Sequence, residues 1–146
     1  MRTKPWHVVL SVLALLALLS VTLYVGIRWS SIPDRVPQHF DAAGAADGYA
    51  GKSSLIGLLL VGWAIYLVQT GVCRAPSTWN IPGKTPRAYQ ALRDMMEVLK
   101  LLLALMFAYI PWCVARGQNL GRWFLPVTLA AVFGTTAVGI IASLRK

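Results

Sequence analysis

The sequence predicts an all-α integral membrane protein, built as a four-helix bundle with both termini on the cytoplasmic side. Hydrophobic residues make up 57% of its 146 residues and charged residues only 13%, proportions outside the usual range of soluble domains. The apolar residues gather in four blocks long enough to cross a bilayer as helices. Lysine and arginine cluster at the ends of these blocks. We therefore expect residues 1–146 to form a single membrane domain in contact with the lipid bilayer.

The first span is expected at about residues 6–27, which carry no formal charge apart from His7. A helix of this length reaches about 33 Å, enough for a complete crossing. A cleaved secretory signal peptide is the alternative, because the first residues are basic. The apolar stretch is longer than the core of a signal peptide, however, and no A-x-A cleavage pattern follows it. We expect a retained anchor.

The remaining spans are expected at about residues 55–73, 97–114 and 123–144. The third should belong to a longer helix from about residue 86 to 113, because Thr85 suits an N-cap and Pro86 a first helical position. Arg93 and Glu97 should lie on the polar side of its amphipathic first half. Lys100 should extend its long side chain to the headgroups.

Orientation follows from the distribution of positive charge. With both termini in the cytoplasm, nine of the fourteen lysine and arginine residues lie on that side and five outside. The loop 28–54 is then extracytoplasmic and the loop 74–96 cytoplasmic. Cys73 and Cys113 would lie at opposite membrane faces, too far apart for a disulfide, so both thiols should be free. The positive charge flanks the spans and forms no continuous face, so no nucleic-acid partner is expected.

The outer loop 28–54 concentrates the informative polar residues of the chain. Pro33 and Pro37 restrict it to extended or turn conformations, and Gly44 and Gly48 permit tight turns, so we expect an ordered loop. Its basic and acidic residues are equal in number and should balance one another: Arg28, Arg35 and Lys52 against Asp34, Asp41 and Asp47.

His39, Asp41 and Asp47 are the weak candidates for metal ligands in this loop, because a metal accepts imidazole and carboxylate together. No H-E-x-x-H, C-x-x-C or EF-hand pattern accompanies them, so neither a metal site nor another cofactor is expected. The alternative is structural. Both aspartates then cap turns, His39 hydrogen-bonds to backbone, and Phe40 and Tyr49 anchor the loop at the membrane interface.

The same loop carries a resemblance to a known family. Its motif residues are Pro33, Pro37, His39, Phe40, Asp41, Gly44, Asp47, Gly48, Tyr49 and Lys52, and this pattern resembles the signature loop of the DUF1648 family, which includes SdpI-like membrane proteins. Asn80, Pro82 and Arg93 resemble the family's second loop and following helix. The resemblance implies a multi-pass protein of the bacterial inner membrane with this loop outside. For SdpI-like members it also implies immunity to a secreted peptide toxin and signalling of its presence.

Three functions follow as hypotheses. The first is a non-catalytic protein whose outer loop senses or binds a peptide, lipid or protein partner. The second is an accessory or structural subunit of a larger membrane complex, suggested by small residues at Gly134, Gly139 and Ala142 and by the absence of an intramembrane acidic residue. The third is a metal-dependent hydrolase. We expect no enzyme, and no transporter because no buried charge marks a path.

Overall fold

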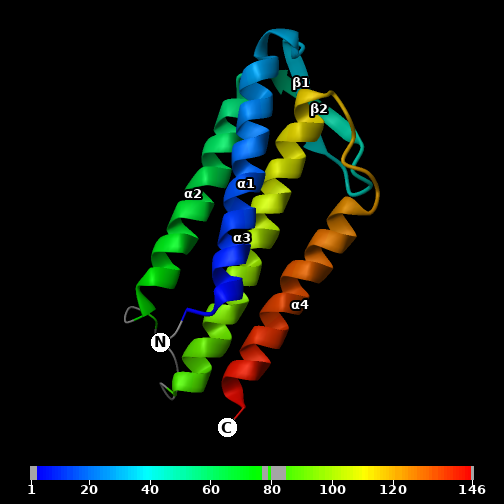
Figure 1. Ribbon diagram of the computed structural model, residues 1–146. Coiled ribbons are helices and arrows are strands. Elements are labelled where there is room, and N and C mark those ends of the chain that lie inside the picture. Colours follow the sequence, from blue (N-terminus) through cyan, green and yellow to red (C-terminus); the bar gives the residue numbers. More distant parts are fainter. Residues whose placement is uncertain (1–2, 77–78, 80–84, 146) are drawn as a thin grey trace.

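The computed structural model describes residues 3–76, 79 and 85–145, and these form four long apolar helices with a small two-stranded hairpin between the first two (Figure 1). The helices are α1 (Pro5–Arg28), α2 (Ser54–Arg74), α3 (Pro86–Ala115) and α4 (Phe124–Leu144). Each is long and apolar enough to cross a membrane. The chain is therefore a multi-pass membrane protein in contact with a lipid bilayer. Both ends of the chain lie at one end of the bundle, and the hairpin lies at the other (Figure 1).

The predicted spans agree with the helices, and the start of α3 shows why. The Thr85 hydroxyl accepts a hydrogen bond from the Ala88 amide at 3.2 Å, and Pro86 occupies the first helical position. The helix continues past Pro111 to Ala115. The expectation of one continuous helix from about residue 86 is confirmed, and the helix ends at Ala115 instead of about residue 113.

The bundle is arranged around α3. The helices α1, α2 and α4 each pack extensively on α3, whereas α1 and α2 touch each other little. Small residues allow two of these approaches: a Cβ atom on Gly62 of α2 would lie 2.9 Å from the Phe107 side chain, and one on Gly139 of α4 would lie 2.5 Å from Met95 Sδ. Of the small residues predicted on α4, Gly139 therefore packs against α3 of the same chain.

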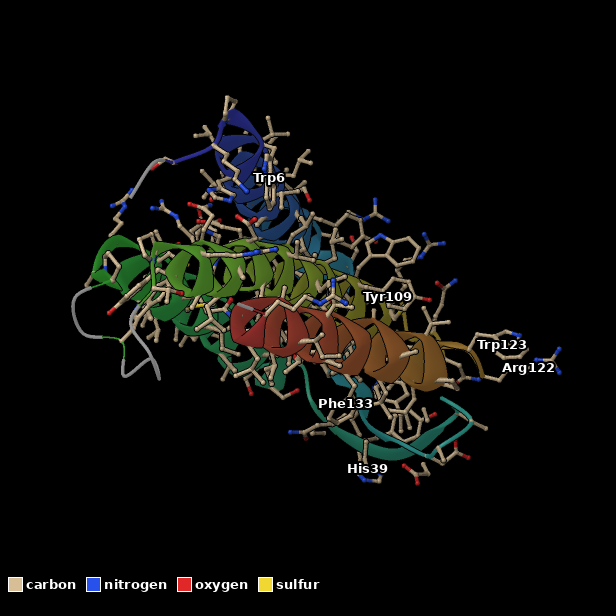
Figure 2. All side chains as sticks on the ribbon, turned by 90° about the horizontal axis from the view of Figure 1, so that it is seen from below. Trp6, His39, Tyr109, Arg122, Trp123 and Phe133 are labelled. Carbon is tan, nitrogen blue, oxygen red and sulfur yellow. The ribbon has the colours of Figure 1, made fainter. Side chains whose placement is uncertain are left out.

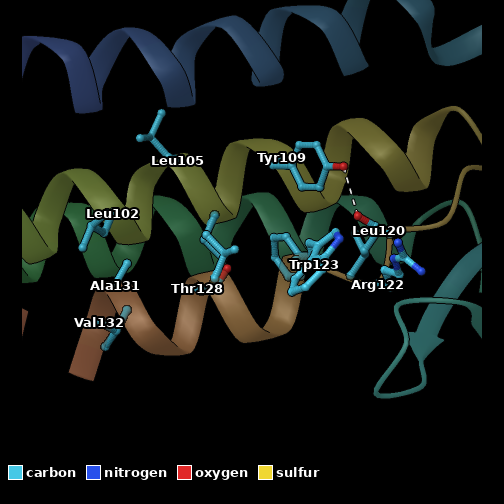
Figure 3. A pocket seen from close by; sticks show the side chains of 13 residues that line it. Leu102, Leu105, Tyr109, Leu120, Arg122, Trp123, Thr128, Ala131 and Val132 are labelled. Atoms are coloured by element: carbon cyan, nitrogen blue, oxygen red, sulfur yellow. Dashed lines mark hydrogen bonds between the residues drawn. The ribbon is translucent and has the colours of Figure 1, made fainter. Parts of the chain in front are cut away.

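The contact between α3 and α4 leaves an apolar groove near the hairpin end of the bundle, with a volume of about 670 Å³ (Figure 3). Its walls include Leu105 on α3 and Val132 on α4. Tyr109 closes the hairpin end of this contact, because its hydroxyl donates a hydrogen bond to the Leu120 carbonyl at 3.1 Å. The groove opens to the surroundings of the helices, which in a membrane are lipid.

The predicted outer loop is ordered, as expected, but the all-α prediction omitted its strands. A short 3-10 helix, η1 (Trp29–Ser31), leads into β1 (Arg35–Phe40), which pairs antiparallel with β2 (Ala46–Gly51). The register is irregular on either side of His39, so His39 lies opposite Gly48.

Two apolar clusters form the core. One lies beneath the hairpin and joins Val21 and Val25 of α1 to Val114 of α3. The other lies deeper in the bundle around Leu18, where Trp63 of α2 donates its indole N–H to Thr22 Oγ1 at 3.0 Å. Cys73 and Cys113 are both buried free thiols, as predicted.

Candidate functional site

The base of the hairpin is part of the protein core. Val36 on β1 is completely buried and Ile32, just before it, is nearly so, and both pack in the cluster with Val25 and Leu55. The Lys52 amide donates to the Asp34 carbonyl at 2.9 Å. The Lys52 ammonium also lies 3.0 Å from the Asp34 carboxylate. The two strands are therefore clamped where they enter and leave the bundle.

The tip of the hairpin is tied to the α3–α4 connection. Gly44 adopts a positive φ of 73° at the turn, and its carbonyl accepts a hydrogen bond from the Leu120 amide at 2.9 Å. A Cβ atom on Gly44 would lie 2.5 Å from the Gly121 carbonyl oxygen. The Ala46 amide donates to the Asn119 side chain at 3.0 Å. Only glycine can occupy position 44 with this contact intact.

Asp41 shapes the turn itself. One of its carboxylate oxygens accepts hydrogen bonds from the Ala43 and Ala45 amides, each at 2.9 Å. The turn-capping interpretation is therefore right for Asp41. Phe40 is half-buried and packs against the core beneath the hairpin. Phe40 thus anchors the hairpin on the protein core, and its anchoring at the membrane interface stays a prediction.

The exposed face of the hairpin carries His39, Asp47 and Tyr49. The His39 Nδ1 atom lies 2.5 Å from Asp47 Oδ1 across the two strands. Asp47 caps no turn and His39 bonds a side chain instead of backbone, so the structural interpretation is wrong for these two residues. Their side chains remain 75% and 47% exposed, and Tyr49 is 57% exposed. His39 points away from the helices (Figure 2).

The three weak candidates for metal ligands do not converge. Asp41 faces the amides of its own turn, whereas His39 and Asp47 face each other. Within residues 3–76, 79 and 85–145, no group of three His, Cys, Asp or Glu side chains is placed to hold a metal ion. The predicted charge balance is also only partial. Lys52 pairs with Asp34, but Arg28 and Arg35 form no ion pair in the described part of the chain.

Comparison with known proteins identifies this segment. A family described as "Domain of unknown function (DUF1648)" matches residues 11–65, which run from α1 through the hairpin into α2. Residues 11–65 form a DUF1648 domain. The chain matched no curated protein and no solved structure. The family prediction is thus confirmed. The motif residues of the hairpin all lie inside the DUF1648 domain, whereas α3 and α4 lie outside the matched residues.

A second group of polar residues lies at the opposite end of the bundle, and it was not predicted. Asp94 of α3 accepts hydrogen bonds from the Lys4 ammonium at 2.7 Å and from Gln90 at 2.8 Å. Its other contact is His7 Nε2, also at 2.7 Å, and His7 is completely enclosed. These contacts fasten the start of α1, just ahead of the DUF1648 domain, to α3.

One turn further into the bundle, Glu97 and Lys100 form a buried ion pair. Lys100 Nζ lies 2.7 Å from Glu97 Oε2, and the two side chains are only 2% and 5% exposed. Ser11, the first residue of the DUF1648 domain, donates to the same carboxylate at 2.9 Å. The prediction that Lys100 reaches the headgroups is wrong, because Glu97 offers a partner three residues away.

The buried carboxylate of Glu97 corrects two further expectations. Glu97 does not lie on an exposed polar side of α3, and the bundle does contain a buried acidic residue. The Arg93 guanidinium donates a hydrogen bond to Thr3 Oγ1 at 3.1 Å. The other predicted members of the second motif, Asn80 and Pro82, lie outside the described residues.

Proposed function

We propose that this protein is a non-catalytic receptor whose hairpin binds a peptide or protein partner outside the cytoplasm. The observation that carries the proposal is a hairpin fixed at base and tip that leaves His39, Asp47 and Tyr49 exposed. A fixed surface loses little conformational freedom on binding, which favours recognition. An exposed aromatic ring beside a polar pair is typical of binding surfaces.

The proposed orientation places the hairpin outside and both termini in the cytoplasm. It is supported by the excess of lysine and arginine near the ends of the chain and in the loop between α2 and α3. The resemblance to SdpI-like proteins supports a bacterial inner-membrane location and a role in sensing or resisting a secreted peptide. Under this proposal the DUF1648 domain supplies the receptor surface.

Site-directed photo-crosslinking in intact cells tests the proposal. A photoreactive amino acid at Tyr49 should crosslink to a specific partner, because this position lies on the exposed face. The matched control is Ser30, which is exposed in η1 at the same end of the bundle. The crosslink from position 49 should disappear in the His39→Ala variant. Equal crosslinking from both positions, or no effect of His39→Ala, would contradict a receptor surface on the hairpin.

A structural subunit of a larger complex is the second candidate. The observation that favours it is α4, which packs almost only on α3 and leaves apolar side chains such as Phe133 and Val138 exposed. Another membrane protein could cover that face. Purification in a mild detergent distinguishes the two candidates, because a subunit should elute with stoichiometric partners and a lone receptor as a monomer or homo-oligomer.

A further inference from the structure

A polar pocket lies at the hairpin end of the bundle, between the ends of α1 and α3. Its volume is about 590 Å³, and its walls include Arg28 and Ser31 on one side and Arg116 and Gln118 on the other. Tyr24 also lines it. Two guanidinium groups, one on the last residue of α1 and one on the residue after α3, therefore border one cavity.

An apolar groove continues from this pocket into the bundle. It lies between α1 and α3, has a volume of about 450 Å³, and shares Tyr24 with the polar pocket. Ala17 and Ala108 keep it open, and Trp112 borders it. From Ala17 to Arg28 an α-helix rises about 16 Å, roughly half of the hydrocarbon thickness of a bilayer. The pocket and groove together therefore extend over about one leaflet.

The two arginines have no acidic partner, because every acidic residue of the chain is engaged elsewhere. The chain has five acidic residues. Asp34 pairs with Lys52, Asp47 with His39, and Glu97 with Lys100. Asp94 contacts Lys4 and His7, and Asp41 accepts hydrogen bonds from backbone amides. Arg116 instead lies over the Trp112 ring, with its guanidinium carbon 4.6 Å from the ring centroid. Two unneutralised guanidinium groups at one pocket favour an anion, and their planar donors match a phosphate.

We propose that the pocket and groove bind one anionic phospholipid of the adjoining leaflet. Its phosphate lies between Arg28 and Arg116, and one acyl chain lies in the groove along Ala17 and Ala108. A soluble anion would use the arginines but would have no need of the apolar groove. The site is separate from the proposed receptor surface: Tyr109, which borders the groove, and His39 lie on different sides of α4 in Figure 2.

Native mass spectrometry of the full chain in a mild detergent tests this proposal. Dioleoyl phosphatidylglycerol is titrated in, and dioleoyl phosphatidylcholine and inorganic phosphate are tested separately as competitors. The native protein should retain one phosphatidylglycerol, which neither competitor displaces at equal concentration. Arg28→Gln and Arg116→Gln should each weaken binding at least about tenfold, the loss expected for one charge-assisted contact. Arg35→Gln, at an exposed arginine outside the pocket, is the matched control and should bind normally.

Two further variants separate the acyl chain from the phosphate. Ala17→Leu fills the groove without touching either arginine, so it should also weaken phosphatidylglycerol binding. Ala130→Leu adds the same bulk to an exposed position of α4 and should have no effect. Unchanged binding in both arginine variants would overturn the site. Displacement by inorganic phosphate, or full binding in Ala17→Leu, would overturn its assignment to a phospholipid.

Discussion

Replacing Lys100 by methionine should destabilise the protein strongly. The substitution preserves most of the side-chain volume but leaves the Glu97 carboxylate buried without its cation, which lies 2.7 Å away in the native protein. Breaking a buried ion pair in this way costs about 3–5 kcal/mol. Ser11 retains one hydrogen bond to the carboxylate, so the lower half of that range is expected.

The chain supplies its own control for this experiment. Lys52 pairs with Asp34 at 3.0 Å, but the Asp34 side chain is 92% exposed. Lys52→Met should therefore cost only about 0–1 kcal/mol, as for other surface pairs. Equilibrium unfolding in mixed micelles measures both free energies. The double variant Lys100→Met with Glu97→Leu removes both charges and should recover most of the loss.

The losses of unfolding free energy in Lys100→Met and Lys52→Met show whether the Glu97–Lys100 pair is desolvated. If Lys100→Met and Lys52→Met cost the same, Glu97 is solvated and the buried pair is not a stabilising unit. If the double variant is less stable than Lys100→Met alone, the cost arises from packing and not from an unpaired charge.

Two glycines give further predictions. Gly44→Ala should lower the free energy of unfolding by at least about 1–2 kcal/mol from its left-handed backbone alone. It should also release the hairpin tip from Gly121, so amide hydrogen exchange at the α3–α4 connection should become faster. Unchanged exchange would contradict the contact between the hairpin tip and this connection. Gly139→Ala should lower the thermal midpoint, because its Cβ atom would meet Met95. A Cβ atom at Gly134 meets no atom within 4 Å, so Gly134→Ala should not lower it. Equal midpoints would contradict close α3–α4 packing.

The helices were predictable because their causes are local. A charge-free apolar block of sufficient length specifies a span, and Thr85 with Pro86 marks the start of α3 through groups only three residues apart. The strands were not predictable in the same way. Pro37 and the irregular register around His39 interrupt the alternation of polar and apolar residues by which a strand is recognised.

The contacts of the candidate site depend on the register and on helix packing, which the sequence does not display. His39 was identified as a site residue, but its pairing with Asp47 follows from the offset between the two strands. His7 and Asp94 are far apart in the chain and meet because α1 packs on α3. Glu97 and Lys100 have the spacing of a helical pair, yet the same spacing fits two solvated side chains.

The central position of α3 bears on the order in which this protein assembles. The segment matched by the family model ends within α2, and the helices α1 and α2 touch each other little. Each packs mainly on α3. After insertion, we therefore expect α1 and α2 to associate only loosely in the bilayer until α3 packs against both. A fragment ending at α2 should insert but lack Val114 and Ala115, which complete the cluster beneath the hairpin.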